Sequence, residues 1–321
     1  MSGHLTTATP ASPAVTRRGA RLLFVHAHPD DETLTTGLTM ASYVSRGHDV
    51  HLLTCTLGEE GEVIPDSLAR LGADRDDALG LWRRDELRAA MSVLGVTHSV
   101  LGEDLLSGVA SRYRDSGMAG TAGALHPDAF VRADLAEVAA QVAAHIRALR
   151  PDVVVTYDEH GGYAHPDHIQ THRVTMAALA SLAVGGDGVA GVVPAAFCIL
   201  TPAGWASQDR AWLHDKVLPD GSGCIVPQQD EPYPPSVVPD EAGTHGVEEP
   251  TMVAIQSRAL ACHATQVVVH DGYYELSNHI ATRLSGREGF ARFDPVAGKL
   301  LPAPPGAARR SGLLDEPQDW L

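Results

Sequence analysis

The stretch RLLFVHAHPDDE, residues 21–32, decides the fold of this chain. A run of apolar side chains ends abruptly in two histidines and three acids. Continuous apolar runs of this length are typical of a strand that is covered on both faces of a parallel sheet. The polar cluster then lies where the strand leaves the sheet, at the edge where open α/β sheets bind ligands. Imidazoles and carboxylates this close together indicate a divalent metal site; the alternative is a polar turn that caps a helix.

Composition excludes several classes of protein. The chain has 321 residues, of which 44% are hydrophobic and 20% charged, so it is long enough for a large core and is not disordered as a whole. It contains no run of about twenty apolar residues, which predicts no membrane span. A formal charge of −16 disfavours phosphate backbones and anionic lipids as partners. The expected partner is therefore a small molecule, with neither nucleic acid nor membrane involved.

The cysteines and the first residues bear on location and domains. The four cysteines are scattered without a CxxC pair, which argues against a disulfide framework and against a zinc site built of cysteines. A secretory signal begins with positive charge and continues with an apolar core, and residues 1–19 do not follow this order. We therefore predict that they form a disordered tail and that the protein is cytoplasmic. We expect one domain over 20–321, with long loops at 57–77, 102–127 and 217–250.

Apolar periodicity predicts alternating strands and helices. Strands are expected at 21–26, 50–55, 96–101, 152–157 and 197–200. Helices are expected at 33–46, 78–94, 130–149, 169–182 and 252–263. This order predicts an α/β, Rossmann-like fold of three αβα layers, with a mainly parallel sheet and an active site at the carboxyl ends of its strands. The glycine-rich turn of dinucleotide-binding proteins is missing after the first strand, which removes the main support for a nucleotide site.

A second polar cluster follows the apolar strand at 152–157. If both strands are parallel in one sheet, both clusters meet at the same edge. The side chains brought within reach of one ion would be His28, Asp30, Asp31, His165 and His168. Such donors suit Zn²⁺, with Fe²⁺ or Mn²⁺ as less common alternatives. A catalytic zinc ion takes three protein ligands and one water, so two of these groups remain for proton transfer, and spacing alone does not say which.

The same His-Pro-Asp tripeptide also occurs at 126–128. No apolar strand precedes this copy, which stands before the helix expected at 130–149. Proline and aspartate are favoured at helix starts, so we predict a structural role for His126. The tripeptide is therefore informative only where a buried strand leads into it.

The chain resembles the zinc-dependent N-acetylglucosamine deacetylases of the PIG-L/LmbE-like family. The resemblance rests on HPDDE at 28–32 and HPDH at 165–168. It extends to TCTLGEEGEV at 54–63, RDSGMAG at 114–120 and HATQV at 263–267. Within the family these motifs are most similar to the mycothiol-pathway enzymes that deacetylate N-acetylglucosaminyl-inositol, a pseudodisaccharide.

The resemblance implies a role for each matching residue. His28, Asp31 and His168 would bind one Zn²⁺ per chain, with Fe²⁺ as the alternative. Asp30 would act as general base towards the attacking water. His165, in its protonated form, and Tyr163 would stabilise the tetrahedral oxyanion, and His165 would compete with Asp30 to protonate the leaving amine.

Two further positions match residues that hold sugar and inositol hydroxyls in the family, namely Arg83 and Asp115. The pattern of the surrounding helix alone would place Arg83 on a solvated face. The chain departs from its relatives at two places. Residues 158–160 are Asp-Glu-His where relatives commonly have Asp-Pro, and Ala164 stands where glycine is common. That departure predicts altered freedom of the loop that carries Tyr163.

Three other functions remain open at the level of sequence. An amidase acting on mycothiol S-conjugates shares the metal motif and much of the sugar site. A non-catalytic sugar-binding protein could use the same scaffold, although it would need neither a base nor a complete ligand set. A dinucleotide-dependent enzyme is the third, and it lacks its glycine turn.

Overall fold

The computed structural model describes residues 19–104, 106–184, 193–217, 221–304 and 306–314. The predicted tail thus lies outside the described residues, except for its last position. Within the described residues the central sheet has nine strands, in the order β14-β8-β12-β5-β4-β1-β2-β3, with β13 paired to β12. These strands are β1 (Arg21–His26), β2 (Asp49–Thr54), β3 (Thr97–Val100), β4 (Val153–Tyr157), β5 (Ala195–Ile199), β8 (His245–Glu248), β12 (Arg287–Asp294), β13 (Lys299–Leu300) and β14 (Arg310–Ser311).

Helices and short strands complete the described chain. The α-helices are α1 (Asp31–Ser45), α2 (Leu79–Leu94), α3 (Leu135–Leu149), α4 (Gly161–Ala164), α5 (Pro166–Val184), α6 (Ala203–Lys216) and α7 (Val253–Leu260). The 3₁₀-helices are η1 (Asp66–Leu71), η2 (Gly123–Leu125), η3 (Phe130–Arg132) and η4 (Pro250–Met252). Two small sheets contain β6 (Thr201–Pro202) with β7 (Val237–Val238), and β9 (Val268–Val269), β10 (Tyr273–Glu275) and β11 (Thr282–Arg283).

The strands β3, β2, β1, β4 and β5 are parallel and form the half of the sheet that positions the site. In the register, Phe24 on β1 lies opposite Leu52 on β2 and Val155 on β4. The chain moves outward from β1 to β2 and β3 on one side and from β4 to β5 on the other. The strand order therefore reverses between β1 and β4, which is where α/β sheets leave a crevice for ligands.

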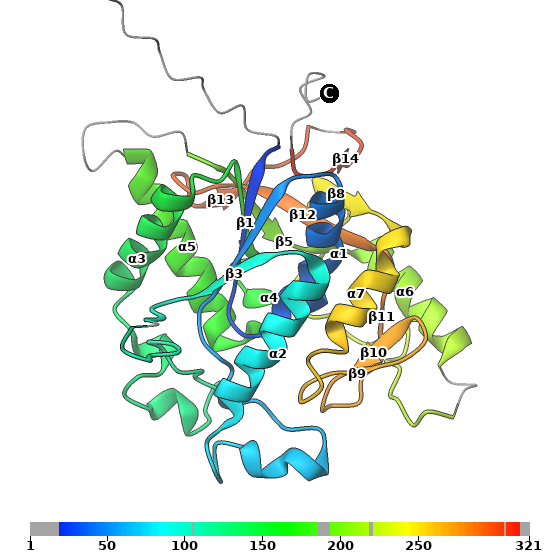
Figure 1. The fold of residues 1–321 in the computed structure, drawn as a ribbon. Coiled ribbons are helices and arrows are strands. Elements are labelled where there is room, and N and C mark those ends of the chain that lie inside the picture. The colour runs from blue at the N-terminus through cyan, green and yellow to red at the C-terminus, as the bar shows by residue number, and fades with distance from the viewer. Residues whose placement is uncertain (1–18, 105, 185–192, 218–220, 305, 315–321) are drawn as a thin grey trace, which may run out of the picture.

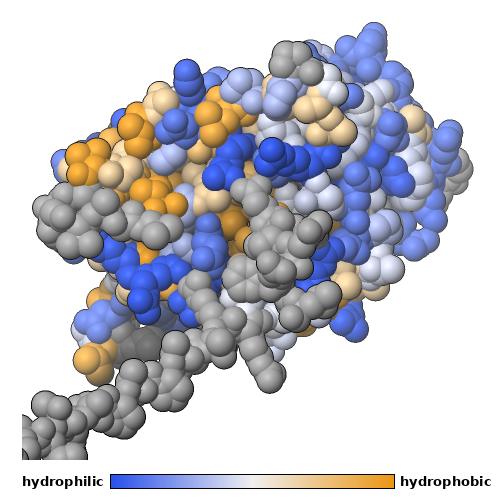
Figure 2. Space-filling view, turned by 90° about the horizontal axis from the view of Figure 1, so that it is seen from above, coloured by the Kyte–Doolittle hydropathy of each residue, from blue (hydrophilic) through white to orange (hydrophobic). Residues whose placement is uncertain are grey.

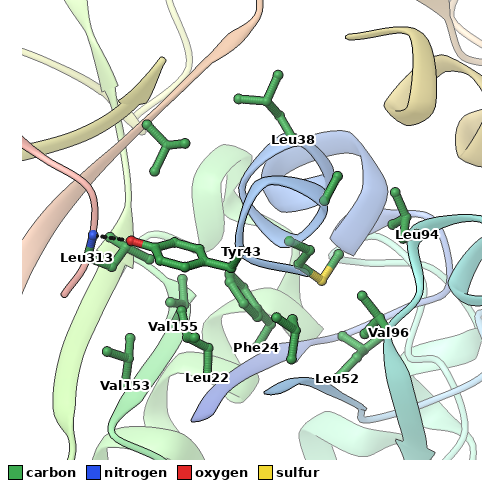
Figure 3. Close-up of a cluster of buried hydrophobic side chains, with 14 of the residues drawn as sticks. Leu22, Phe24, Leu38, Tyr43, Leu52, Leu94, Val96, Val153, Val155 and Leu313 are labelled. Atoms are coloured by element: carbon green, nitrogen blue, oxygen red, sulfur yellow. Dashed lines mark hydrogen bonds between the residues drawn. The ribbon is translucent and has the colours of Figure 1, made fainter. Parts of the chain in front are cut away.

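Two helix layers cover the sheet (Figure 1). On one face α1, α2 and α7 pack together, and Leu38 and Tyr43 of α1 lie over Leu22 and Phe24 of β1 (Figure 3). The Tyr43 hydroxyl accepts a hydrogen bond from the Leu313 backbone N–H at 2.6 Å, which ties the C-terminal segment to α1. On the other face α3 packs against α5. The predicted three-layer α/β fold with a mainly parallel sheet is confirmed.

The structure differs from the predicted elements in the middle and last thirds of the chain. The helix expected at 130–149 begins only at Leu135, because the Asp134 side chain accepts a hydrogen bond from the Glu137 N–H at 2.9 Å and caps it there. The predicted loop at 217–250 contains β7 and β8, and β8 pairs with β12 in the central sheet. His126 is an exposed residue that directly follows η2, away from the apolar strands, and its structural role stays a prediction.

The outer surface is mixed in character. No helix within the described residues is long and apolar enough to cross a membrane. Figure 2 views the molecule from above, and hydrophobic residues gather towards the side on which α3 and α5 lie in Figure 1. Hydrophilic and neutral residues make up most of the remaining visible surface, in keeping with the high content of charged residues.

Candidate active site

Two strand ends supply the centre of the site. β1 ends at His26 and α1 begins at Asp31, so the turn between them carries His28 and Asp30. β4 ends at Tyr157, and α5 places His168 in its first turn. Because β1 and β4 are adjacent and parallel, both turns lie at the same edge of the sheet. Figure 1 places α4, which joins β4 to α5, between the two helix layers.

Three donor atoms converge at this edge. His28 Nδ1 lies 3.1 Å from Asp31 Oδ2. His168 Nε2 lies 3.2 Å from the same carboxylate oxygen and 3.3 Å from His28 Nδ1. A tetrahedral zinc ion with bonds of about 2.0–2.1 Å separates neighbouring ligand atoms by about 3.3–3.4 Å. All three side chains are buried. The three atoms therefore have the spacing and the shielding from solvent that a metal site requires.

Hydrogen bonds fix which ring nitrogens face the centre. His28 Nε2 lies 3.3 Å from both Asp115 Oδ1 and Asp167 Oδ2, so in a metal-bound form the ring proton would stay on Nε2 and Nδ1 would face the metal. His168 Nδ1 lies 3.1 Å from the Gly161 carbonyl and donates to it, which leaves Nε2 as the acceptor. Partners of this kind orient the histidine ligands of metal ions. The two ring nitrogens and the Asp31 oxygen surround one point, where a cation would be favoured.

The charges around His28 support this conclusion. Burial alone would lower the pKa of His28, but Asp115, Asp167 and Asp31 raise it well above its usual value. Carboxylates that favour a proton on His28 also favour a metal cation beside it. The described residues thus contain a candidate metal site with nitrogen and carboxylate donors.

The structure allows a second combination of donors. His28, His165 and His168 also present ligand atoms within 4.8 Å of one another. The rings of His28 and His165 meet edge to face, with centroids 4.7 Å apart. The closer spacing of Asp31 with His28 and His168 favours those three as the ligands and leaves His165 beside the open position.

Asp30 sits next to this centre in a strained turn. Its φ of 97° and ψ of −38° are unusual for a residue other than glycine and cost about 1–3 kcal/mol. The Asp30 Oδ2 atom accepts a hydrogen bond from Arg83 Nη2 at 3.0 Å. Burial raises the pKa of Asp30 to about 7, although Arg83 opposes this shift. A carboxylate with a pKa near 7 is suited to exchange a proton at neutral pH.

A buried pair below the turn holds Asp30 in place. Glu32 Oε2 accepts a hydrogen bond from the Asp30 backbone N–H at 3.0 Å, and Glu32 Oε1 lies 3.1 Å from His263 Nε2. Both side chains are fully buried. Sequence reasoning assigned no role to either residue. His263 belongs to the HATQV motif at 263–267, which resembles the family, but nothing in that motif indicates Glu32 as its partner.

The environment of His165 corrects one expectation. The Asp167 N–H donates to His165 Nδ1 at 3.1 Å, so the neutral ring carries its proton on Nε2. Burial, followed by the nearby rings of His28 and His168, lowers the pKa of His165 to about 3. The expected protonated His165 is therefore wrong for this structure, because two histidines and burial disfavour a second positive charge. Neutral His165 can still donate a hydrogen bond from Nε2.

Tyr163 stands at the rim of the site. Its ring meets the rings of His168 and His165 edge to face, with centroids 5.0 and 6.0 Å away, and 52% of the residue is exposed. Partial desolvation beside the site and the nearby charge of Asp31 raise the pKa of Tyr163 above its usual value, so its hydroxyl stays protonated. The Tyr163 segment is also strained, since Ala164 has a φ of 70°.

Arg83 and Asp115 are buried and bonded to the protein. Arg83 donates to the carbonyls of Pro29 and Gly58 as well as to Asp30, so it lies on the buried face of α2 rather than in solvent. Asp115 accepts hydrogen bonds from two backbone N–H groups and faces His28. Asp167, a partner of His28 that the sequence did not single out, stands inside the HPDH motif.

Comparison with known proteins identifies relatives over nearly the whole chain. The family model described as GlcNAc-PI de-N-acetylase (PIG-L) matches residues 23–179. A protein of Thermomonospora curvata is 42% identical over 299 residues, covering 92% of this chain and 96% of its own length. A protein of Streptomyces scabiei is 44% identical over 311 residues, covering 95% and 92%. Both are named 1D-myo-inositol 2-acetamido-2-deoxy-alpha-D-glucopyranoside deacetylase.

Among solved structures, a 4-carboxy-2-hydroxymuconate hydratase from Pseudomonas putida matches with a TM-score of 0.48 and 19% identity, covering 77% of this chain and 80% of its own. The family motifs at 28–32 and 165–168 both fall inside the segment that the family model matches. On the strength of that match and of the close relatives, the chain belongs to the PIG-L (GlcNAc-PI de-N-acetylase) family.

Proposed function

We propose that this protein is a zinc-dependent deacetylase that hydrolyses the acetamide of 1D-myo-inositol 2-acetamido-2-deoxy-alpha-D-glucopyranoside and releases acetate and glucosaminyl-inositol. The observation that carries the proposal is the triangle of His28 Nδ1, Asp31 Oδ2 and His168 Nε2, with Asp30 buried beside it. The substrate comes from the names of relatives that are 42% and 44% identical. A cytoplasmic location remains a prediction of the sequence.

The donor set fits zinc. Two imidazole nitrogens and one carboxylate oxygen, with no thiolate, match the three-ligand sites of catalytic zinc. His28, Asp31 and His168 would hold the ion, and the Tyr157 hydroxyl supports Asp31 by donating to Oδ2 at 2.8 Å. When bound, zinc supplies a Lewis acid and lowers the pKa of a water ligand to about 7.

Asp30 is proposed as the group that moves the proton. As a carboxylate it accepts a proton from the water that attacks the acetamide carbon, and it then returns that proton to the nitrogen of the leaving amine. Arg83 fixes the acceptor oxygen at 3.0 Å, and Glu32 fixes the backbone N–H. Burial and the nearby histidines lower the pKa of His165, which favours Asp30 over His165 as the acid for the amine.

His165 and Tyr163 are proposed to stabilise the developing oxyanion. The Nε2–H of His165 and the hydroxyl of Tyr163 are both neutral donors beside the metal ligands. Donors that are already oriented stabilise an oxyanion without reorganisation, and removing one costs about 10²–10³ in rate. Tyr163 lies at the exposed rim, so its hydroxyl is also placed to close over a substrate.

The proposed contacts of Arg83 and Asp115 with sugar and inositol hydroxyls draw on the family resemblance. In the described structure Arg83 Nε has no hydrogen-bond partner, so one donor of that guanidinium is still free. The carboxylate of Asp115 already accepts backbone hydrogen bonds through both oxygens, and Oδ1 also faces His28 Nε2, which leaves a second lone pair on Oδ2. Both residues are buried, so they position Asp30 and His28 here, and their contacts with substrate hydroxyls stay a proposal from the family resemblance.

The test is acetate release from N-acetylglucosaminyl-inositol together with metal analysis. Purified protein should contain zinc, lose activity when a chelator removes it, and regain activity on addition of Zn²⁺; Fe²⁺ is added in parallel. Retention of full activity by metal-free protein would overturn the proposal. Binding of the sugar without turnover by the metal-loaded protein would identify a sugar-binding protein instead.

Substrate preference needs a second comparison. The same preparation is assayed with N-acetylglucosaminyl-inositol and with a mycothiol S-conjugate, and kcat/KM is measured for each. We expect the larger value for the acetylated pseudodisaccharide. A larger value for the conjugate would assign the amidase function to this chain.

A further inference from the structure

A second group of metal-binding side chains lies away from the strand ends that carry the catalytic residues. Cys224 follows α6, His270 follows β9, Glu275 ends β10, and His279 stands in the turn before β11. These segments form a small unit in which α6 packs on β11, and Figure 1 shows them at the opposite side of α7 from α3 and α5. Sequence reasoning gave none of the four residues a role.

The three inner donors converge on one point. His270 Nε2 lies 3.9 Å from Cys224 Sγ and 2.9 Å from Glu275 Oε1. One ligand atom from each of the three residues lies within 4.8 Å of the other two. A tetrahedral zinc ion places a sulfur and a nitrogen ligand about 3.5 Å apart and a nitrogen and an oxygen ligand about 3.3 Å apart. The two distances from His270 Nε2, 3.9 and 2.9 Å, each differ from these values by about 0.4 Å.

Neighbouring groups orient these donors. The second oxygen of Glu275 lies 2.8 Å from His279 Nδ1, which directs the first oxygen towards His270. The ring of His270 stacks on Tyr273, with centroids 4.5 Å apart and planes 6° apart. Metal ligands are commonly held by such outer partners. Glu275 is itself buried, so its charge requires compensation from this cluster.

The backbone holds the cysteine against the hairpin. The Ile225 N–H donates to the His279 carbonyl at 2.7 Å, and the Ala281 N–H donates to the Ile225 carbonyl at 2.9 Å. Cys224 also packs against a small apolar cluster that contains Leu213 and Tyr273. These backbone hydrogen bonds and apolar contacts together hold the Cys224 thiol next to His270.

A catalytic triad of cysteine, histidine and acid would require a different geometry. In a triad one ring nitrogen faces the nucleophile and the other faces the acid. Here the same atom, His270 Nε2, faces both Cys224 and Glu275. Burial and the nearby Glu275 also raise the pKa of the Cys224 thiol, which opposes its use as a free nucleophile. Atoms that surround a common point are instead typical of metal ligands.

We propose that Cys224, His270 and Glu275 bind a second divalent cation of the zinc class. On binding, the thiol proton passes to solvent and a thiolate–metal bond forms, so thiolate and carboxylate together neutralise the dication. A water molecule fills the fourth position, and His279 remains the outer partner of Glu275. The ion ties the segment after α6 to the β9–β10 hairpin, a structural role that is independent of the proposed deacetylation.

Cobalt(II) distinguishes this site from the catalytic one. Thiolate ligands give Co²⁺ an intense charge-transfer absorption in the near ultraviolet, and the catalytic donor set contains no thiolate. Metal-free full-length protein titrated with Co²⁺ should develop this band, as should Cys262→Ser, a matched control at another partly exposed cysteine. Cys224→Ser should lack the band. Absence of the band from the wild type, or an unchanged band in Cys224→Ser, would overturn the proposal.

Zinc stoichiometry provides a second measurement that does not depend on the cysteine. After dialysis against a weak chelator the wild type should retain two zinc ions per chain, Glu275→Gln one, and Asp31→Asn one. Glu275→Gln should still release acetate at the wild-type rate, which reports that it is folded. One zinc ion in the wild type, or two in Glu275→Gln, would show that this cluster holds no specific ion.

Discussion

Asp30 and Asp31 are adjacent residues with the same side chain and opposite environments. Burial alone would raise both pKa values, but His168 and His28 hold the pKa of Asp31 well below its usual value. The pKa of Asp30 rises to about 7, because Arg83 and His263 do not offset burial and the nearby charge of Asp31. When the environments of two carboxyl groups separate their pKa values, the group with the lower pKa stays ionised and the other can exchange a proton.

This division predicts different losses from the same substitution. Asp30→Asn should keep its zinc content and lower kcat about 10²–10⁴-fold, since it removes only the proton acceptor. Asp31→Asn should lose the catalytic zinc ion, because an amide oxygen does not carry the charge that balances the dication. Metal analysis and acetate-release kinetics on both variants decide this. Full activity of Asp30→Asn would contradict the assignment of the base.

His263 offers a test of the buried pair beneath Asp30. His263→Ala would leave Glu32 as a buried carboxylate without its 3.1 Å partner, and breaking such a pair costs about 3–5 kcal/mol. The free energy of unfolding is measured by denaturant titration. His126→Ala, at an exposed histidine, is the control and should change it little. Equal stabilities of the two variants would show that the pair contributes nothing.

At the scale of elements, the segment from β4 to α5 carries strain at Ala164. Its φ of 70° lies in the left-handed region, which costs a residue with a Cβ about 1–2 kcal/mol. Ala164→Gly should therefore raise the free energy of unfolding by about 1 kcal/mol. Ala140→Gly, at an exposed position inside α3, should lower it by about 1 kcal/mol. Destabilisation by both substitutions would show that Ala164 is not strained.

The elements that the sequence predicted well are those with strong apolar patterns. β1 and β4 are buried on both faces and were found to within one residue. α6 was missed because its buried residues are few, Arg210 and Leu213, so it has no apolar stripe to recognise. β12 was missed because it is an antiparallel strand that contains charged residues and a glycine, and its pattern is set by the partners it meets.

At the scale of the whole molecule, Glu288 joins three elements. From β12 it accepts hydrogen bonds from the backbone N–H groups of Leu38 and Thr39 in α1, at 3.0 and 2.8 Å, and from Gln256 in α7 at 3.3 Å. Burial raises the pKa of Glu288 to about 7, despite the hydrogen bonds from Thr39 and Leu38 that favour the anion. The charge of this carboxyl group is therefore costly to the folded state.

A pH dependence of stability follows. The folded-state pKa lies above the unfolded one, so the protonated group contributes stability below about pH 4.5 that is lost as pH rises through 7. Relative to Glu288→Gln, which stays neutral, the wild type should lose up to about 3 kcal/mol of unfolding free energy between pH 4.5 and 8. Denaturant titrations of both proteins across that range measure the difference. A difference that is independent of pH would contradict the raised pKa.

The sequence by itself determined the fold class and the chemical nature of the site. Continuous apolar strands are typical of a sheet covered on both faces, and the His, Asp and Glu residues that follow them then lie at its carboxyl edge. The polar clusters at 28–32 and 165–168 were expected to meet because the strands that precede them were expected to be parallel. Local sequence carries this information because strand length, apolar content and ligand type are all properties of short segments.

Only the tertiary structure decided which atom does what. The proton on His28 is placed by Asp115 and Asp167, which lie far from it in the chain. Burial and then the rings of His28 and His168 lower the pKa of His165, and Glu32 meets His263 across 231 positions. Charges, tautomers and pKa values depend on distance in space and on burial, and neither is written in the spacing of residues along the chain.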